Sequence, residues 1–406
     1  MDVFARGCWR GRRFLRLTIL IVMIAWARVS EAEAQWRPLR EVAIAGDFES
    51  DFFGLAALGG GRVALARVGP SFEGTHAVRG LVFDRYLFLR HDFLVATRGK
   101  DTSVAFLCPV VAHLGGGSLA FAWLETSSET ARARIAYRVV GAEGSPLGPI
   151  RFVESDRVGG LGCPSLDGGP LGFVVGWSRA LTSDNNVHDL RLRTFSVDGR
   201  PTSASFSVAR SRSSTSVPSI AVEPDGGFVA AWGVELADGT QDLFLGRFGR
   251  MGGPLGPVKK VVAGARDLIA FARSRRGELD LIWARGQGSS GRVLRARRFD
   301  GDFEAISRAK TVLSTFLPVV PASVIDRLGR TAFIAQTSFS VRGFTLGPTL
   351  ALCGPEITVS ELWPQGLFRI VSSKPGEVVV AGVDFSSGAR DMYLRSYALP
   401  LCAETL

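Results

Sequence analysis

Histidine, lysine, tyrosine and cysteine are all scarce in this chain, and each shortage narrows the chemistry that it can perform. There are four histidines, five lysines, four tyrosines and five cysteines among 406 residues. His76, His91, His113 and His188 lie far apart and never in the compact spacing that zinc sites require. We therefore expect most of the histidines to be loop or surface residues, and we predict no metal site built on them and no cofactor.

Basic clusters are also missing, although the chain is basic overall. The formal net charge is +10, and almost all of the positive charge is arginine that is spread along the sequence. A nucleic-acid interface would need a clustered basic patch or stripe. We predict a solvated basic surface and no nucleic-acid partner.

Only one apolar run is long, and it lies near the N-terminus. The run LTILIVMIAWA (17–27) follows a stretch with four arginines (10–16) and precedes the small residues of AEA (32–34). This order is typical of a secretory signal peptide. Eleven residues rise only about 16 Å as a helix, whereas the hydrocarbon core of a bilayer is roughly 30 Å thick. We predict a signal peptide over residues 1–34 and a secreted or periplasmic protein with no membrane span after cleavage.

Two alternatives at this N-terminus stay open. The apolar run is strong enough that an uncleaved anchor is the competing interpretation. The stretch GRRFLR (11–16) is similar to a twin-arginine export signal but lacks the usual spacer after the second arginine. The route of export therefore stays undecided at this point.

Glycine and proline are abundant, with 48 and 19 copies, and many of them lie in a sequence segment that recurs along the chain. The segment VPSIAVEPDGGFVAAW (217–232) is matched closely by CPVVAHLGGGSLAFAW (108–123) and CPSLDGGPLGFVVGW (163–177), and by DLIAFARSRRGELDLIW (267–283) without the proline. Weaker copies occur at 51–68, 321–336 and 366–382. Self-similarity at a fixed period predicts a repeat architecture of seven units.

Each copy has the composition of a β-hairpin. An alternating apolar segment meets a glycine turn and continues into a second segment that is apolar almost throughout, as expected for a strand covered on both faces. The copies end on Trp123, Trp177, Trp232 and Trp283, which we expect to be core residues between units. The glycines at which we expect positive φ are Gly60, Gly117, Gly169, Gly227, Gly277, Gly329 and Gly376.

A third alternating strand and a short fourth strand follow each hairpin, so each unit has four strands. The 372 residues after the signal divide into seven units of about 53 residues, the pattern of an all-β, seven-bladed β-propeller of four-stranded antiparallel blades over 35–406. The last unit lacks a fourth strand, and we predict that residues 39–46 supply it and close the ring. The approximate units are 47–98, 99–155, 156–210, 211–263, 264–314, 315–361 and 362–406.

With these repeats the chain resembles secreted bacterial β-propellers built from degenerate P-S-[IV]-A-x-x-x-D-G-G-F-V-V-A-W units. The resemblance covers roughly residues 39–400. It implies the propeller architecture and implies no activity, because propellers host enzymes, binding proteins and scaffolds alike.

The four cysteines left after removal of the signal favour disulfides in an exported chain. Cys108 and Cys163 stand at the same place in neighbouring repeats, where the innermost strands converge on the channel, so we predict a bridge between them. Cys353 and Cys402 follow the third strands of the last two units, and we predict that they staple the C-terminal tail.

Three motifs invite a functional interpretation and have a simpler structural one. The loop SDNNVHD (183–189) offers calcium the oxygens of Asp184, Asn185, Asn186 and Asp189, but a solvated hairpin loop is the favoured interpretation. SLDGGPLGF (165–173) and Arg369 approach the Asp-box and an arginine of sialidases, but neither matches in spacing or place. The third strands carry recurring arginines, for which we expect a structural role rather than an anion-binding ring: Arg138, Arg193, Arg297, Arg342 and Arg395.

The sequence names no catalytic or ligand-binding residue. We expect an exported, monomeric, non-catalytic protein that presents its loops and channel mouth to a protein or glycan ligand. The alternatives are a hydrolase or lyase with a sialidase-like architecture that acts on glycans or another polymer at the channel mouth, and a structural component of the cell surface. Convergent acids and arginines at one mouth would favour the enzyme, whereas glycine and apolar side chains would favour binding.

Overall fold

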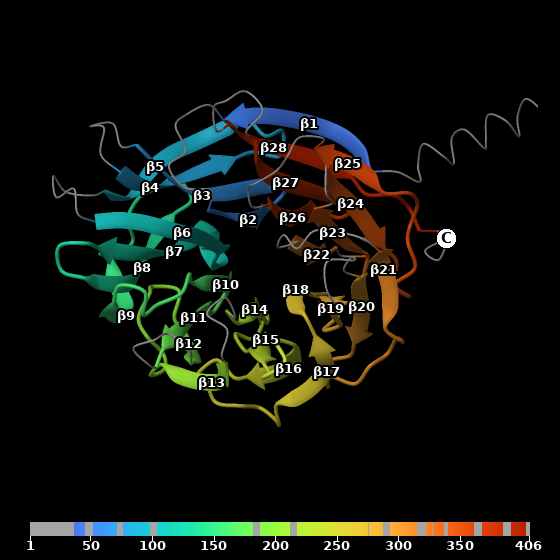
Figure 1. The fold of residues 1–406 in the computed structure, drawn as a ribbon. Helices are drawn as coiled ribbons and strands as arrows, with labels where there is room; N and C mark the ends of the chain where they lie inside the picture. The colour runs from blue at the N-terminus through green and yellow to red at the C-terminus, as the bar shows by residue number, and fades with distance from the viewer. Residues whose placement is uncertain are drawn as a thin grey trace, which may run out of the picture.

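The protein is a closed ring of seven four-stranded antiparallel sheets around a central channel (Figure 1). This confirms the predicted seven-bladed β-propeller. Apart from a single 3-10 turn at Gly115–Gly117, the described part of the chain contains no helix. The computed structural model describes residues 36–44, 52–70, 76–97, 104–181, 187–211, 217–274, 276–286, 293–314, 322–326, 328–336, 340–360, 368–384 and 391–402.

The blades follow one another in chain order, and in each of the first six the strands are numbered from the channel outwards. Blade 1 contains β2 (Phe53–Gly59), β3 (Arg62–Pro70), β4 (His76–Phe83) and β5 (Leu89–Thr97). Blade 2 contains β6 (Val104–His113), β7 (Ser118–Ser127), β8 (Arg132–Gly141) and β9 (Arg151–Arg157). Blade 3 contains β10 (Ser165–Gly169), β11 (Gly172–Ala180), β12 (His188–Phe195) and β13 (Phe206–Ser211). Blade 4 contains β14 (Ser219–Val222), β15 (Phe228–Glu235), β16 (Gln241–Phe248) and β17 (Lys259–Ala265).

The remaining blades complete the ring, and the last one takes its outer strand from the other end of the chain. Blade 5 contains β18 (Asp267–Arg273), β19 (Leu279–Arg285), β20 (Val293–Phe299) and β21 (Lys310–Ser314). Blade 6 contains β22 (Ala322–Ile325), β23 (Thr331–Gln336), β24 (Val341–Leu346) and β25 (Ile357–Ser360). Blade 7 contains β26 (Phe368–Lys374), β27 (Glu377–Asp384), β28 (Asp391–Ala398) and β1 (Arg37–Ile44).

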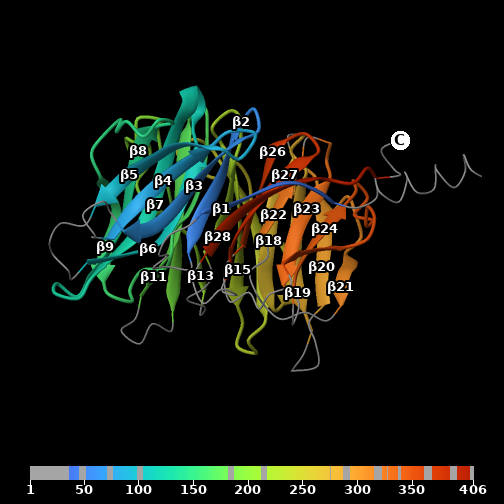
Figure 2. The same ribbon diagram turned by 90° about the horizontal axis from the view of Figure 1, so that it is seen from above.

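The strands run between two faces of the ring (Figure 2). We call the face that carries the turns between the first and second strands of each blade the hairpin face; Gly59–Arg62 and Gly169–Gly172 are two of these turns. The chain enters the propeller at this face, because Arg37 pairs with Ala398 beside the β26–β27 turn.

The core lies between blades, as the apolar second strands predict. Trp123, Trp177 and Trp232 are fully buried and Trp283 is nearly so. Trp232 shares its core with Leu190 of the preceding blade, so the repeated tryptophans fill the space between neighbouring sheets.

The ring is closed by pairing the two ends of the chain. Strand β1 pairs antiparallel with β28 and is the fourth strand that the last repeat lacks, which confirms the prediction. Trp36 is buried beside β1, and its indole N–H donates to the hydroxyl of Thr345 in blade 6 at 2.6 Å. This hydrogen bond attaches the start of the described chain to blade 6, the neighbour of the blade that β1 closes.

The two cysteine pairs lie at the distance of disulfides. The Cα atoms are 5.5 Å apart in Cys108–Cys163 and 4.8 Å apart in Cys353–Cys402, both within the range that a disulfide spans. The first pair connects blades 2 and 3. The second connects the turn after β24 to the segment after β28.

Five of the seven turn glycines have the predicted positive φ, and two predictions were wrong. Gly169 and Gly227 are not in this region; Gly172 and Gly226 take that role instead, with φ of 151° and 86°. The turn after β14 closes one residue earlier than expected, because the Gly226 N–H donates to the Glu223 carbonyl at 2.9 Å. At Gly172, a Cβ atom would lie 2.1 Å from the Phe195 carbonyl oxygen, so no side chain fits there.

The predicted signal peptide, residues 1–34, lies outside the described residues. None of the helices formed by the described residues is long and apolar enough to span a membrane.

Candidate functional site

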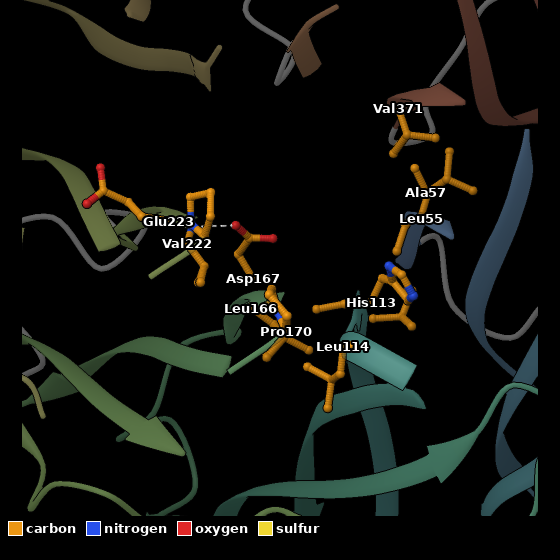
Figure 3. Close-up of a pocket in the computed structure, with 17 residues that line it drawn as sticks. Leu55, Ala57, His113, Leu114, Leu166, Asp167, Pro170, Val222, Glu223 and Val371 are labelled. Atoms are coloured by element: carbon orange, nitrogen blue, oxygen red, sulfur yellow. Dashed lines mark hydrogen bonds between the residues drawn. The ribbon is translucent and has the colours of Figure 1, made fainter. Parts of the chain in front are cut away.

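A cavity of about 510 Å³ lies at the hairpin face of the channel (Figure 3). Its walls come from the innermost strands of blades 1, 2, 3, 4 and 7 and from the turns that follow some of them. The cavity size falls in the range of small-molecule sites. The residues labelled around it in Figure 3 are Leu55, Ala57, His113, Leu114, Leu166, Asp167, Pro170, Val222, Glu223 and Val371.

The walls of the cavity are mainly apolar. Where the innermost strands reach the mouth, they carry mostly small or aliphatic side chains, such as Leu55, Ala57 and Val371. In each blade that carries a repeated tryptophan, one residue of the first strand pairs with the second-strand residue that lies three positions before that tryptophan. In blades 2, 4 and 5 this first-strand residue is alanine: Ala112, Ala221 and Ala272. In blade 3 the same position is Asp167. This acid is therefore a departure from the repeat and not a requirement of it.

The Asp167 carboxyl group binds the neighbouring blade and points into the cavity. Its Oδ2 accepts a hydrogen bond from the Val222 N–H of β14 at 2.7 Å. Figure 3 shows the carboxyl group directed away from Leu166 and towards the open space of the mouth. Burial raises the pKa of Asp167 to about 6, and the hydrogen bonds from the Val222 and Gly168 N–H groups oppose this shift in part.

The second acid of the mouth is neutralised by arginines. The Glu223 carboxylate forms ion pairs with Arg273 at 2.8 Å and with Arg247 at 3.4 Å. Figure 3 shows the Glu223 carboxylate pointing away from Asp167. The two acids therefore do not form the facing carboxylate pair that glycoside hydrolysis uses.

His113 is the third titratable group of the mouth. It ends β6 and is half-buried, and burial together with the nearby charge of Arg62 lowers its pKa. The imidazole is therefore held in its neutral form near neutral pH. It adds a hydrogen-bonding group but no positive charge to the cavity.

A second, polar pocket lies in blade 2. Its volume is about 370 Å³. Burial raises the pKa of Glu125, which accepts from the Trp123 indole at 3.0 Å and pairs with Arg134 at 3.2 Å. The acid is thus committed to two partners within its own sheet, which is the pattern of a structural ion pair. The pocket is lined by Val104, Glu125, Thr126, Ser127, Thr130, Arg132, Arg134 and Ser155.

The two sialidase-like motifs are not brought together as a sialidase site. Asp167 lines the mouth from β10, whereas Arg369 lies in β26, donates to the Phe368 carbonyl and contacts the Phe53 ring. Burial lowers the pKa of Arg369. No arginine trio facing an acid of the mouth occurs among the residues that the structure describes.

The calcium candidate is only partly described. Asp184, Asn185 and Asn186 lie outside the described residues. Asp189 accepts a hydrogen bond from Ser207 and forms an ion pair with Arg191 at 3.6 Å. Within the described ranges, no group of three or more histidine, cysteine or acidic side chains could hold a metal ion.

The recurring arginines of the third strands bind backbone carbonyl groups. Arg138 donates to Val95 of the preceding blade at 2.8 Å and to Gly148 in its own blade at 3.1 Å. The contacts between blades therefore rest on hydrogen bonds and not only on packing of the side-chain stem. Arg193 and Arg395 reach Val153 and Val359 in the same way, whereas Arg297 binds Ser307 in its own blade and Arg342 pairs with Glu356.

The expectation that most histidines are loop or surface residues holds only in part. All four lie in strands; His91 is exposed, His76 and His113 are half-buried, and His188 is buried in β12. His113 also lines the mouth. The isolated positions gave no indication of this, because burial depends on which strand end faces the channel or the next blade.

Asp167 was missed as a site residue although its segment was considered. The motif SLDGGPLGF (165–173) was compared only with the Asp-box. Aligning the repeats on their tryptophans places Asp167 opposite Ala112 and Ala221, and an acid in an alanine column would have indicated the site.

No protein-family model matches the chain, and no curated protein matches it. Among solved structures it is similar to the lectin BP39L from Burkholderia pseudomallei, with a TM-score of 0.55 and 14% identity over 87% of this chain and 99% of the other. It is also similar to the α-L-arabinofuranosidase Arb93A from Fusarium graminearum, with a TM-score of 0.50 and 11% identity over 89% of this chain and 98% of the other. At such identities the likeness shows the propeller fold alone.

Proposed function

We propose that this protein is an exported, non-catalytic binding protein whose ligand enters the channel mouth at the hairpin face. The observation that carries the proposal is the composition of that mouth. Its walls are mainly aliphatic, Asp167 is a single acid without an ion-pair partner among the described residues, and Glu223 is neutralised by two arginines. An apolar cavity with few polar groups suits binding.

The proposal includes the organisation of the chain. Residues 1–34 are the signal peptide and residues 35–406 form one propeller domain. The two cysteine pairs at disulfide distance are compatible with an extracellular or periplasmic location, where disulfides persist.

Binding at the mouth is tested with a variant that fills it. Ala57→Trp places an indole in the cavity, and Ala142→Trp adds the same group to a turn between third and fourth strands, away from the mouth. Residues 35–406 and both variants are screened on a glycan array and by thermal shift against a small-molecule library. The proposal expects ligands whose binding is lost in Ala57→Trp and kept in Ala142→Trp. Ligands that bind all three proteins equally would contradict a site at the mouth.

Catalysis is tested directly on the same protein. Arabinan, sialyllactose and a panel of chromogenic glycosides are incubated with the wild type and with Asp167→Asn between pH 5 and 7.5. We expect no product formation above the Asp167→Asn background. If the wild type turns over a substrate and Asp167→Asn abolishes this turnover, the protein is a hydrolase and the proposal of a non-catalytic binding protein is wrong.

A further inference from the structure

The carboxylate of Asp167 is the most unusual group of the mouth. The Asp167 side chain is half-buried. A carboxylate that is partly withdrawn from water without a cation is costly, and such groups are normally paired. No cationic side chain of the described residues lies within ion-pair distance of Asp167, and the hydrogen bonds from the Val222 and Gly168 N–H groups use only part of the capacity of a carboxylate to accept. The remaining capacity faces the cavity (Figure 3).

The charged groups around Asp167 leave a place for one cation. On the β6 side, His113 is held neutral, with Arg62 beyond it. On the β14 side, Glu223 is occupied by Arg247 and Arg273. The walls contributed by β2 and β26 are aliphatic, with Leu55, Ala57 and Val371.

We propose that the mouth binds a small organic molecule that carries a primary ammonium group, with the ammonium on Asp167 and its apolar body against the aliphatic wall. This inference rests on the proposed function and names its ligand class. An ammonium group supplies the N–H donors that the free lone pairs of the carboxylate accept, at the higher strength of a charge-assisted bond. The aliphatic walls then cover a hydrocarbon body.

Other cations fit the same mouth less well. A metal ion such as calcium takes six to eight oxygen ligands, and Asp167 is the single unpaired acid among the described lining residues. Quaternary ammonium ions are recognised by aromatic cages, and the lining residues include no phenylalanine, tyrosine or tryptophan. The primary ammonium is therefore the cation that this wall selects.

The test compares three probes of similar size by isothermal titration calorimetry at pH 7.5: hexylammonium, 1-hexanol and hexyltrimethylammonium. Hexylammonium is expected to bind the wild type most tightly. Asp167→Asn, which keeps the shape and an oxygen for Val222, is expected to weaken hexylammonium by at least roughly tenfold, as for a lost bond to a charged group, and to leave hexanol unchanged. Glu143→Gln removes an exposed carboxylate from a turn between third and fourth strands and is expected to change nothing.

The pH dependence of the wild type gives a second test that needs no variant. Protonation of Asp167 removes the charge, so hexylammonium affinity is expected to fall as the pH drops below about 6 while hexanol affinity stays constant. Equal affinity for hexylammonium and hexanol, or a flat pH profile, would overturn the inference. The proposed function would then still stand if Ala57→Trp abolishes the binding of another ligand. If Ala57→Trp abolishes the binding of no ligand, the proposed function and this inference both fail.

Discussion

At the scale of the single residue, Asp167 couples the stability of the fold to pH. Its folded pKa of about 6 lies above its usual value of 3.8, because the fold withdraws the carboxyl group from water. The folded state therefore takes up this proton more readily than the unfolded state between pH 6 and pH 4, and stability attributable to Asp167 rises as the pH falls through this window. Above pH 6 the buried charge costs free energy.

Asp167→Asn should remove that cost. At pH 7.5 we expect the variant to be more stable than the wild type by at most about 3 kcal/mol, the value of roughly two pKa units. Near pH 4 the two should be equal, because the wild type is then mostly neutral. Thermal midpoints of both proteins at the two pH values check this. A variant that is less stable at pH 7.5 would mean that the hydrogen bond to Val222 outweighs the cost of burial.

The buried ion pair of Arg298 and Asp280 differs from Asp167 because both of its charges are paired. Arg298 and Asp280 are both buried and form two hydrogen bonds of 2.7 Å, and Arg298 also donates to Pro348 and Gly329 of the next blade. Paired and hydrogen-bonded charges of this kind are the ordinary way to bury ions. The contrast supports a ligand role for Asp167.

At the scale of the element, the cysteine pairs fasten neighbouring blades. The pairs close loops of 55 and 49 residues. In the chain-entropy model each bridge would stabilise the fold by about 4 kcal/mol. The first acts at the channel and the second near the end of the chain.

Replacing either pair by serine should lower the thermal midpoint, and the doubly replaced protein should lose the most. Mass spectrometry of the unreduced, digested wild type should find peptides joined through Cys108–Cys163 and Cys353–Cys402. A reducing agent should lower the midpoint of the wild type and leave that of the doubly replaced protein unchanged. Free thiols at these four positions in the unreduced protein would contradict the prediction.

At the scale of the whole molecule, stability depends on closing the ring. Strand β1 covers the outer edge of β28, and an uncovered edge is open to pairing with other chains. Buried Trp36 adds packing against Tyr397, with ring centroids 5.6 Å apart.

Deleting residues 35–44 should therefore open the ring. We expect a large fall in the thermal midpoint and association of the opened molecules through β28, whereas the complete domain 35–406 should elute as a monomer. Trp36→Ala is the milder change and should cost about 3–5 kcal/mol, as for other buried tryptophans. Size-exclusion chromatography with light scattering and thermal unfolding measure both. An unchanged midpoint after deletion would show that the ring does not need its closing strand.

The repeats were sufficient to predict the blades, their number and the closing strand. Each unit carries its own alternation, turn glycines and apolar second strand, and these act over a few residues, so they can be recognised from local pattern alone. The pairing of Cys108 with Cys163 was predictable for a related reason, because equal positions in adjacent repeats become neighbours in the ring.

Only the assembled ring decided where the chemistry lies. Asp167 meets Val222 across 55 residues, and Glu223 meets Arg273 across 50, because blades that are separate in sequence converge on one channel. The neutral His113, the buried His188 and the carbonyl contacts of Arg138 follow from the same convergence. Burial and charge pairing are properties of the space between blades, and that space exists only once all seven have closed around the axis.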